Sequence, residues 1–85
     1  MVNTKKLPLP ETTEECTSLL NSIISSIESS SLFEQKNAYE LLEILYKKRC
    51  KKALSWLYEK YHRHPLLYVQ KFAKKALEYR GHLDP

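Results

Sequence analysis

The chain has 85 residues, which is enough for one domain with a single hydrophobic core. Its composition, 42% apolar and 28% charged residues, is typical of a soluble globular domain, and no apolar run is long enough to span a membrane. Since Gly81 is the only glycine, the sequence disfavours β-strands joined by tight hairpin turns and Gly-rich phosphate-binding loops over residues 1–80, and the fold class that we expect is all-α.

An N-terminal arm over residues 1–11 is predicted to be extended or disordered. Pro8 and Pro10 restrict their own backbone and bias the preceding residues away from helix. We expect a single helical domain to follow over residues 12–85.

The first helix is predicted over residues 13–29. Thr12 and Glu15 form a capping box at its start. Apolar residues recur at helical spacing on one face: Cys16, Leu19, Leu20, Ile23, Ile24 and Ile27. The opposite face carries no charge: Ser18, Asn21, Ser22, Ser25 and Ser26. This face is either a weakly charged surface or a surface on which a partner helix packs.

A second helix is predicted to begin near Leu32, where Ser31 and Glu34 form another capping box. Its apolar stripe contains Ala38, Leu41, Leu42, Leu45 and Tyr46. A second stripe follows the basic residues: Cys50, Ala53, Leu54, Leu57 and Tyr61. The centre of the second stripe is rotated by roughly 100° from the first. We therefore expect a break or kink within residues 47–52; the alternative is one long helix that changes neighbours.

The clearest helix boundary lies at His64 and Pro65, because proline disfavours helix in the residue before it and suits the first turn of the next helix. The last helix is predicted over residues 65–80, with Gly81 as the residue that ends it. Its apolar face contains Leu66, Val69, Phe72, Ala73, Ala76 and Leu77. The segments together predict a compact bundle or orthogonal array of three to four helices with short connections.

Charge is distributed unequally along the chain. Residues 1–46 hold three Lys or Arg residues and seven Glu, whereas residues 47–85 hold eleven Lys or Arg residues and three Asp or Glu. This asymmetry suggests contact with a polyanion. The alternative is that an acidic helix packs beside basic ones within the domain.

The two cysteines, Cys16 and Cys50, both lie on apolar stripes, where a free cysteine behaves as a small hydrophobic residue. We expect reduced thiols and an intracellular location, cytoplasmic or nuclear. Neither cysteine has a second cysteine at ligand spacing, so we expect no metal site. We also expect no cofactor, no catalytic residues and no enzymatic activity, because the sequence holds no recognisable catalytic motif.

The basic cluster of residues 47–52 is the best candidate for a functional surface. If this segment is helical, its four lysines share an arc of about 140°, and Arg63 extends the same face. Trp56 lies about 100° from the centre of its local stripe, so it either packs on a neighbouring helix or is an exposed anchor for a partner. The candidate binding residues for a partner or polyanion are Lys47, Lys48, Lys51, Lys52, Trp56, Arg63, Lys71, Lys74 and Lys75.

Two functions follow from these observations. The first is a small basic helical interaction or regulatory protein that acts by binding another protein, with a homodimer as one form of that interaction. The alternative is a nucleic-acid-binding regulator whose lysine-rich helical face contacts phosphates without reading the base sequence. A solvated lysine face with no partner would explain the cluster equally well.

Overall fold

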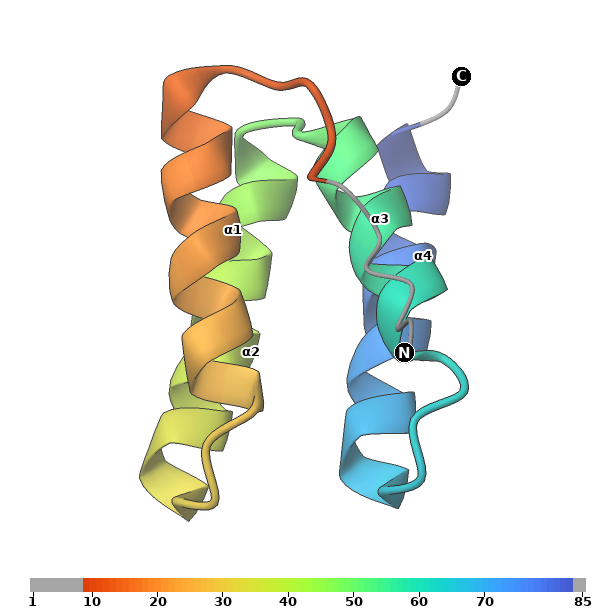
Figure 1. Ribbon diagram of the computed structural model, residues 1–85. Coiled ribbons are helices and arrows are strands. Elements are labelled where there is room, and N and C mark those ends of the chain that lie inside the picture. The colour runs from red at the N-terminus through yellow and green to blue at the C-terminus, as the bar shows by residue number, and fades with distance from the viewer. Residues whose placement is uncertain (1–8, 84–85) are drawn as a thin grey trace, which may run out of the picture.

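The computed structural model describes residues 9–83, which form four α-helices and, within that range, no β-strand. The helices are α1 (Glu14–Ile27), α2 (Leu32–Lys47), α3 (Lys51–Tyr61) and α4 (Leu67–Leu83). Figure 1 shows two antiparallel hairpins side by side, α1 with α2 and α3 with α4, so α2 and α4 point in the same direction. The predicted all-α helical bundle is confirmed, and residues 1–8 of the predicted arm lie outside the described range.

Helix α1 begins one residue later than its capping box indicates, because Thr13 and not Thr12 is the N-cap. The Thr13 hydroxyl accepts a hydrogen bond from the amide of Cys16 at 3.2 Å. The Thr12 hydroxyl lies 3.0 Å from the hydroxyl of Thr17 instead. Two adjacent threonines offer the same capping chemistry, so the sequence alone does not choose between them.

Helix α2 begins at the predicted position, with Ser31 as its N-cap accepting from the amide of Glu34 at 3.5 Å. Only this half of the capping box forms. The Ser31 amide donates to the Ser29 hydroxyl at 3.1 Å, and the Glu34 carboxylate accepts from the Ser26 hydroxyl at 3.3 Å. Ser26 is buried, and a buried hydroxyl requires a hydrogen-bond partner, which Glu34 supplies.

The predicted break within residues 47–52 is confirmed. The turn passes through Arg49, whose φ of 59° lies in the left-handed region. The Arg49 amide donates to the Tyr46 carbonyl at 2.9 Å, and the Cys50 amide donates to the Leu45 carbonyl at 3.2 Å. This is the Schellman pattern that ends helices, usually with glycine where Arg49 stands. The two apolar stripes therefore belong to two helices with different axes.

Helix α4 begins at Leu67, two residues later than predicted. The segment before it is a turn in which the Leu66 amide donates to Nδ1 of His64 at 3.1 Å. Leu66 therefore lies outside the helix and does not follow its periodicity. Leu66 and Leu77 were both predicted on the buried face, and both are exposed because one precedes the helix and the other lies at the edge of the buried stripe.

The prediction that Gly81 ends the last helix is wrong. Helix α4 continues through Gly81 to Leu83, and Gly81 does not adopt the positive φ that a terminating glycine would need. Contacts with α2 reach the C-terminal part of α4. The Tyr46 ring of α2 stacks on the Tyr79 ring with 4.7 Å between centroids, and its centroid lies 6.2 Å from the centroid of the His82 ring. Packing against α2 therefore accompanies the extension of α4.

The hydrophobic core draws on all four helices. Leu45, Leu57 and Phe72, which the sequence places in the core, are fully buried. Other fully buried residues are Leu20, Ile23, Ile27, Ala38, Leu42, Ala53, Leu54, Ala73 and Ala76. The apolar periodicity thus identifies most of the core, while Leu66 and Leu77 are exposed.

Cys16 and Cys50 form a disulfide, so the prediction of reduced thiols is wrong. Their Cα atoms lie 6.1 Å apart, within the range that a disulfide requires. Cys16 lies in the first turn of α1 and Cys50 is the N-cap of α3. The stripes show which face each cysteine occupies, but only packing of the two helices brings the sulfur atoms together.

Candidate functional site

The basic cluster of residues 47–52 does not lie on one helix. The Nζ atom of Lys47 lies 3.9 Å from the carboxylate of Glu43, one turn earlier in α2. The Nζ atom of Lys48 lies 2.7 Å from the carboxylate of Glu15 in α1. The turn then changes the chain direction, so the two lysines after it belong to α3. The common arc was expected only for a continuous helix, and the turn at residues 48–50 means that it does not form.

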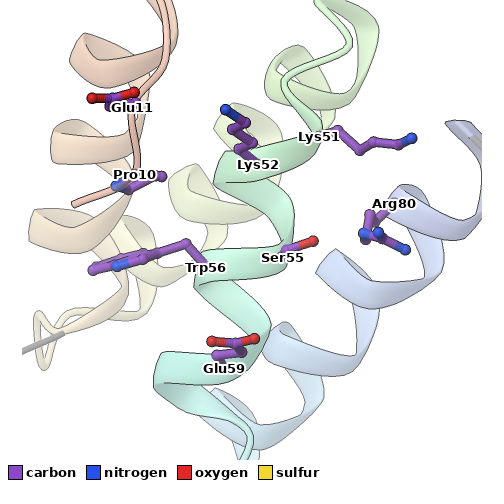
Figure 2. Close-up of a pocket in the computed structure, with 8 residues that line it drawn as sticks. All are labelled: Pro10, Glu11, Lys51, Lys52, Ser55, Trp56, Glu59 and Arg80. Carbon is purple, nitrogen blue, oxygen red and sulfur yellow. The ribbon is translucent and has the colours of Figure 1, made fainter. Parts of the chain in front are cut away.

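Trp56 is a buried residue and not an exposed anchor. Its side chain is 8% exposed and joins the core. Figure 2 shows it extending from α3 toward Pro10, while Lys51 lies on the side of α3 that faces Arg80. The open pocket around them has a volume of about 360 Å³ and is lined by Pro10, Glu11, Lys51, Lys52, Ser55, Trp56, Glu59 and Arg80.

The remaining predicted cations lie in two other places. Arg63 is exposed in the turn between α3 and α4, at the end of α3 opposite the basic cluster. Lys71, Lys74 and Lys75 are exposed on α4, where the Nζ atom of Lys75 lies 3.6 Å from the carboxylate of Glu78. The nine predicted residues therefore lie at the end of α2, on α3, in the turn after α3 and on α4, and the three α4 lysines share one helix face.

The two hairpins carry net charges of opposite sign. Residues 9–47, which include α1 and α2, hold two Lys residues and seven Glu. Residues 51–83, which include α3 and α4, hold eight Lys or Arg residues and two Glu. The charge asymmetry of the sequence thus becomes an acidic hairpin beside a basic one.

The uncharged face of α1 divides into an exposed part and a buried part. Ser18, Ser22 and Ser25 are exposed, as a weakly charged surface would be. Ser26 is buried, and its hydroxyl oxygen accepts from Nδ2 of Asn37 in α2 at 3.5 Å. One edge of the serine-rich face therefore packs within the α1/α2 hairpin.

The sequence reasoning missed an exposed apolar surface at one end of the molecule. Four large exposed side chains define this apolar end: Leu32 (80% exposed), Phe33 (77%), Leu66 (47%) and Leu67 (63%). The first two begin α2, and the last two lie at the start of α4. Figure 1 shows the first turns of α2 and α4 both at the lower end of the molecule, α2 on the left and α4 on the right.

A groove between α2 and α4 adjoins the apolar end. The α2/α4 groove has a volume of about 460 Å³ and is lined by Leu32, Phe33, Gln35, Lys36, Tyr39 and Tyr68. The rings of Tyr39 and Phe72 pack in a T-shaped arrangement with 5.3 Å between their centroids. This contact anchors the Tyr39 wall of the groove to the core. Burial raises the pKa of the Tyr39 hydroxyl, as expected for a ring set into an apolar surface. The groove therefore offers a largely apolar surface with aromatic walls.

Helical geometry contains a signal for this surface. At about 100° per residue, Phe33 points some 180° away from Leu42 at the centre of the buried stripe of α2. Leu67 likewise lies on the side of α4 opposite Val69 and Ala76, which are buried. A large apolar residue opposite the core stripe cannot be buried by its own bundle. The sequence therefore singles out Phe33, but not the neighbour that joins it in space.

The described residues contain no group of three or more His, Cys, Asp or Glu placed to hold a metal ion. Tyr61 has an unusual environment, since its hydroxyl donates to the carboxylate of Glu28 at 2.6 Å. Burial, together with this hydrogen bond and the negative charge of Glu28, raises the pKa of Tyr61 far above its ordinary value. The raised pKa keeps the Tyr61 hydroxyl protonated, so that it can donate the hydrogen bond that links the two hairpins.

No protein-family model, curated protein or solved structure matches this chain significantly. Among the described residues, no helix combines the length and the apolar content that crossing a membrane requires.

Proposed function

We propose that this protein acts by binding another protein, and that the apolar end with the α2/α4 groove is its binding surface. The observation that carries the proposal is the exposure of Leu32, Phe33, Leu66 and Leu67 at one end of the molecule. Clustered apolar side chains of this size on a small domain mark interaction sites. No catalytic role is proposed.

Energetics favour an occupied surface. Burying a large apolar side chain gains about 1.5–3 kcal/mol relative to leaving it in water. The bundle gains nothing of this kind from Phe33 or Leu67, whose directions are set by their helices. A partner that covered them would recover that free energy, and the rings of Tyr39 and Tyr68 would add aromatic contact area.

Photo-crosslinking in the cells that make the protein tests this proposal. Benzoylphenylalanine would replace Phe33 in one variant and the exposed Ser18 of α1 in a control variant. We expect a discrete crosslinked protein from position 33 only. Excess unlabelled protein should suppress it, while excess Leu32→Ser/Phe33→Ser protein should not. Equal products from both positions, or equal suppression by both competitors, would contradict the proposal.

A second candidate function is polyanion binding by α4. It is supported by the excess of cations in the α3/α4 hairpin and by Lys71, Lys74 and Lys75 on one exposed helix face. Phosphate contacts would make the affinity for duplex DNA or RNA fall steeply with salt. Lys71→Ala/Lys74→Ala/Lys75→Ala should flatten that dependence, whereas Lys47→Ala/Lys48→Ala should not. Absence of binding at low salt would eliminate this candidate.

A further inference from the structure

We propose that the Cys16–Cys50 disulfide is a site of reversible thiol exchange. In this exchange the thiolate of a small anionic thiol bonds to the sulfur of Cys16, and the sulfur of Cys50 leaves as a thiolate. The covalent link between the two hairpins is then open. The site lies at the end of the molecule opposite the apolar end and is independent of the proposed binding surface (Figure 1).

A surface pocket gives access to the disulfide. This disulfide pocket has a volume of about 220 Å³, and both Cys16 and Cys50 line it. The two residues are only 7% and 5% exposed, so the pocket is the route by which a reagent reaches their sulfur atoms. A small thiol can therefore approach the disulfide without unfolding of the bundle.

The start of α3 stabilises a thiolate at Cys50. Cys50 is the N-cap of α3, and no described side chain caps the amides of the first turn. Arg49 and Lys52 flank it and line the disulfide pocket. Helix N-termini and neighbouring cations both favour a cysteine thiolate. At the start of α1, by contrast, the Thr13 hydroxyl already accepts from the amide of Cys16 at 3.2 Å.

The charges around Cys16 have the opposite sign. Glu14 and Glu15 precede it in α1, and Glu11 lines the disulfide pocket. The Nζ atom of Lys48 lies 2.7 Å from the carboxylate of Glu15 and offsets one of these charges. The remaining negative charge disfavours a thiolate at Cys16. Because exchange is faster when the departing thiolate is more stable, Cys16 retains the new disulfide and the other cysteine departs.

The disulfide pocket also favours an anionic reagent. Its charged lining residues are three cations and one carboxylate: Arg49, Lys51, Lys52 and Glu11. A net positive pocket attracts an anion, and salt weakens this attraction. Glutathione, whose carboxylates outnumber its ammonium group, is a thiol of this class.

The exchange is balanced in two steps. The thiolate of glutathione attacks Sγ of Cys16, a new S–S bond forms, and the electron pair of the old S–S bond passes to Sγ of Cys50. A second glutathione thiolate then attacks the glutathione sulfur of the mixed disulfide and releases the thiolate of Cys16, which takes a proton from water. The protein disulfide is reduced and glutathione is oxidised to its own disulfide; the reverse steps restore the link.

Trapping of the mixed disulfide in the wild type tests which sulfur is attacked. The protein is exposed to glutathione without denaturant and sampled before reduction is complete. Free thiols are alkylated with N-ethylmaleimide, and peptide mass spectrometry locates both adducts. We expect glutathione on Cys16 and the maleimide on Cys50. Glutathione on Cys50, equal amounts on both cysteines, or no glutathione adduct at any time would overturn the proposal.

Reaction rates test the role of the disulfide pocket. Arg49→Gln/Lys52→Gln should slow the reaction with glutathione roughly fivefold at low ionic strength, and the reaction with neutral 2-mercaptoethanol by less. Lys71→Gln/Lys74→Gln removes the same charge from the exposed face of α4 and should leave both rates unchanged. Equal slowing of the two thiols, or equal effects of the two variants, would overturn the assignment of an anionic reagent.

Urea at low concentration separates exchange in the folded protein from exchange after unfolding. We expect the rate of reaction with glutathione to stay nearly constant below the unfolding transition. A rate that rises steeply from the first addition of urea would show an inert structural disulfide that thiols reach only after unfolding. That result, or a wild type that glutathione does not reduce without urea, would overturn the proposal.

Discussion

Tyr61 shows how a single residue links the two hairpins. It lies at the end of α3 with its ring buried, and its hydroxyl donates to Glu28, the C-cap of α1. The ring also packs near Phe72 of α4, with 6.5 Å between centroids. One side chain thereby joins three helices and spans the boundary between the acidic and basic hairpins.

The raised pKa of Tyr61 makes stability depend on pH at the alkaline end. The folded protein holds the hydroxyl proton more tightly than the unfolded chain, whose tyrosine has a pKa of 10.0. This contribution is complete below that value and is lost as pH rises from about 10 toward the folded pKa. We expect urea unfolding at increasing pH to show a loss of unfolding free energy that Tyr61→Phe reduces.

At pH 7, Tyr61→Phe should cost about 1 kcal/mol through the lost hydrogen bond. Tyr58→Phe is the matched control, because Tyr58 is only half-buried and its ring stacks on His62 without linking the hairpins. An identical alkaline loss in the wild type and in Tyr61→Phe would show that Tyr61 does not carry this pH dependence.

At the scale of elements, the helix ends are where local chemistry and packing compete. The left-handed residue in the turn before α3 is Arg49, although left-handed backbone favours glycine. The one glycine, Gly81, lies inside α4, where helical propensity disfavours it. Helix ends in this protein are therefore set by hydrogen bonds and packing more than by the position of glycine.

Gly81→Ala should stabilise the protein by about 0.5–1 kcal/mol, because alanine loses less backbone entropy in a helix. An added Cβ would meet nothing within 4 Å. Thermal unfolding would show a higher Tm for Gly81→Ala than for Gly81→Asn. The opposite order would mean that Gly81 adopts the left-handed conformation of a helix terminator, which asparagine tolerates and alanine does not.

At the scale of the whole molecule, the disulfide ties the start of α1 to the start of α3 across a sequence separation of 34 residues. It connects the two hairpins at the end opposite the apolar end (Figure 1). The prediction of an intracellular location rested on reduced thiols. The disulfide removes that support, because such bonds persist mainly in oxidising compartments.

Reduction should lower the unfolding free energy by about 3–4 kcal/mol, since the disulfide restricts the unfolded chain over a loop of this length. Urea unfolding with and without reductant would measure the loss. Cys16→Ser/Cys50→Ser should resemble the reduced protein and show no response to reductant. A wild type that is equally stable in both buffers would argue against a stabilising disulfide.

The sequence predicts much of the fold and little of the site. The stripes in α1, α2 and α3, the break near Arg49 and the boundary at His64 all depend on residues close together in the chain. The predicted binding residues stay a prediction, but the lysines before and after residue 50 lie on two helices and do not share the arc that one continuous helix would give them. Trp56 illustrates the same limit, since the helical wheel shows its direction but not what covers it.

Local patterns in the chain predict the helical class, the start of α2, the break before α3 and most of the core, because apolar periodicity and capping depend on neighbouring residues. Packing of the helices brings Cys16 to Cys50, accompanies the extension of α4 through Gly81, and places the starts of α2 and α4, with their exposed apolar residues, at the same end of the molecule. These features join residues that are far apart in the chain or depend on contacts between helices. They follow from how the hairpins pack, which no local pattern specifies.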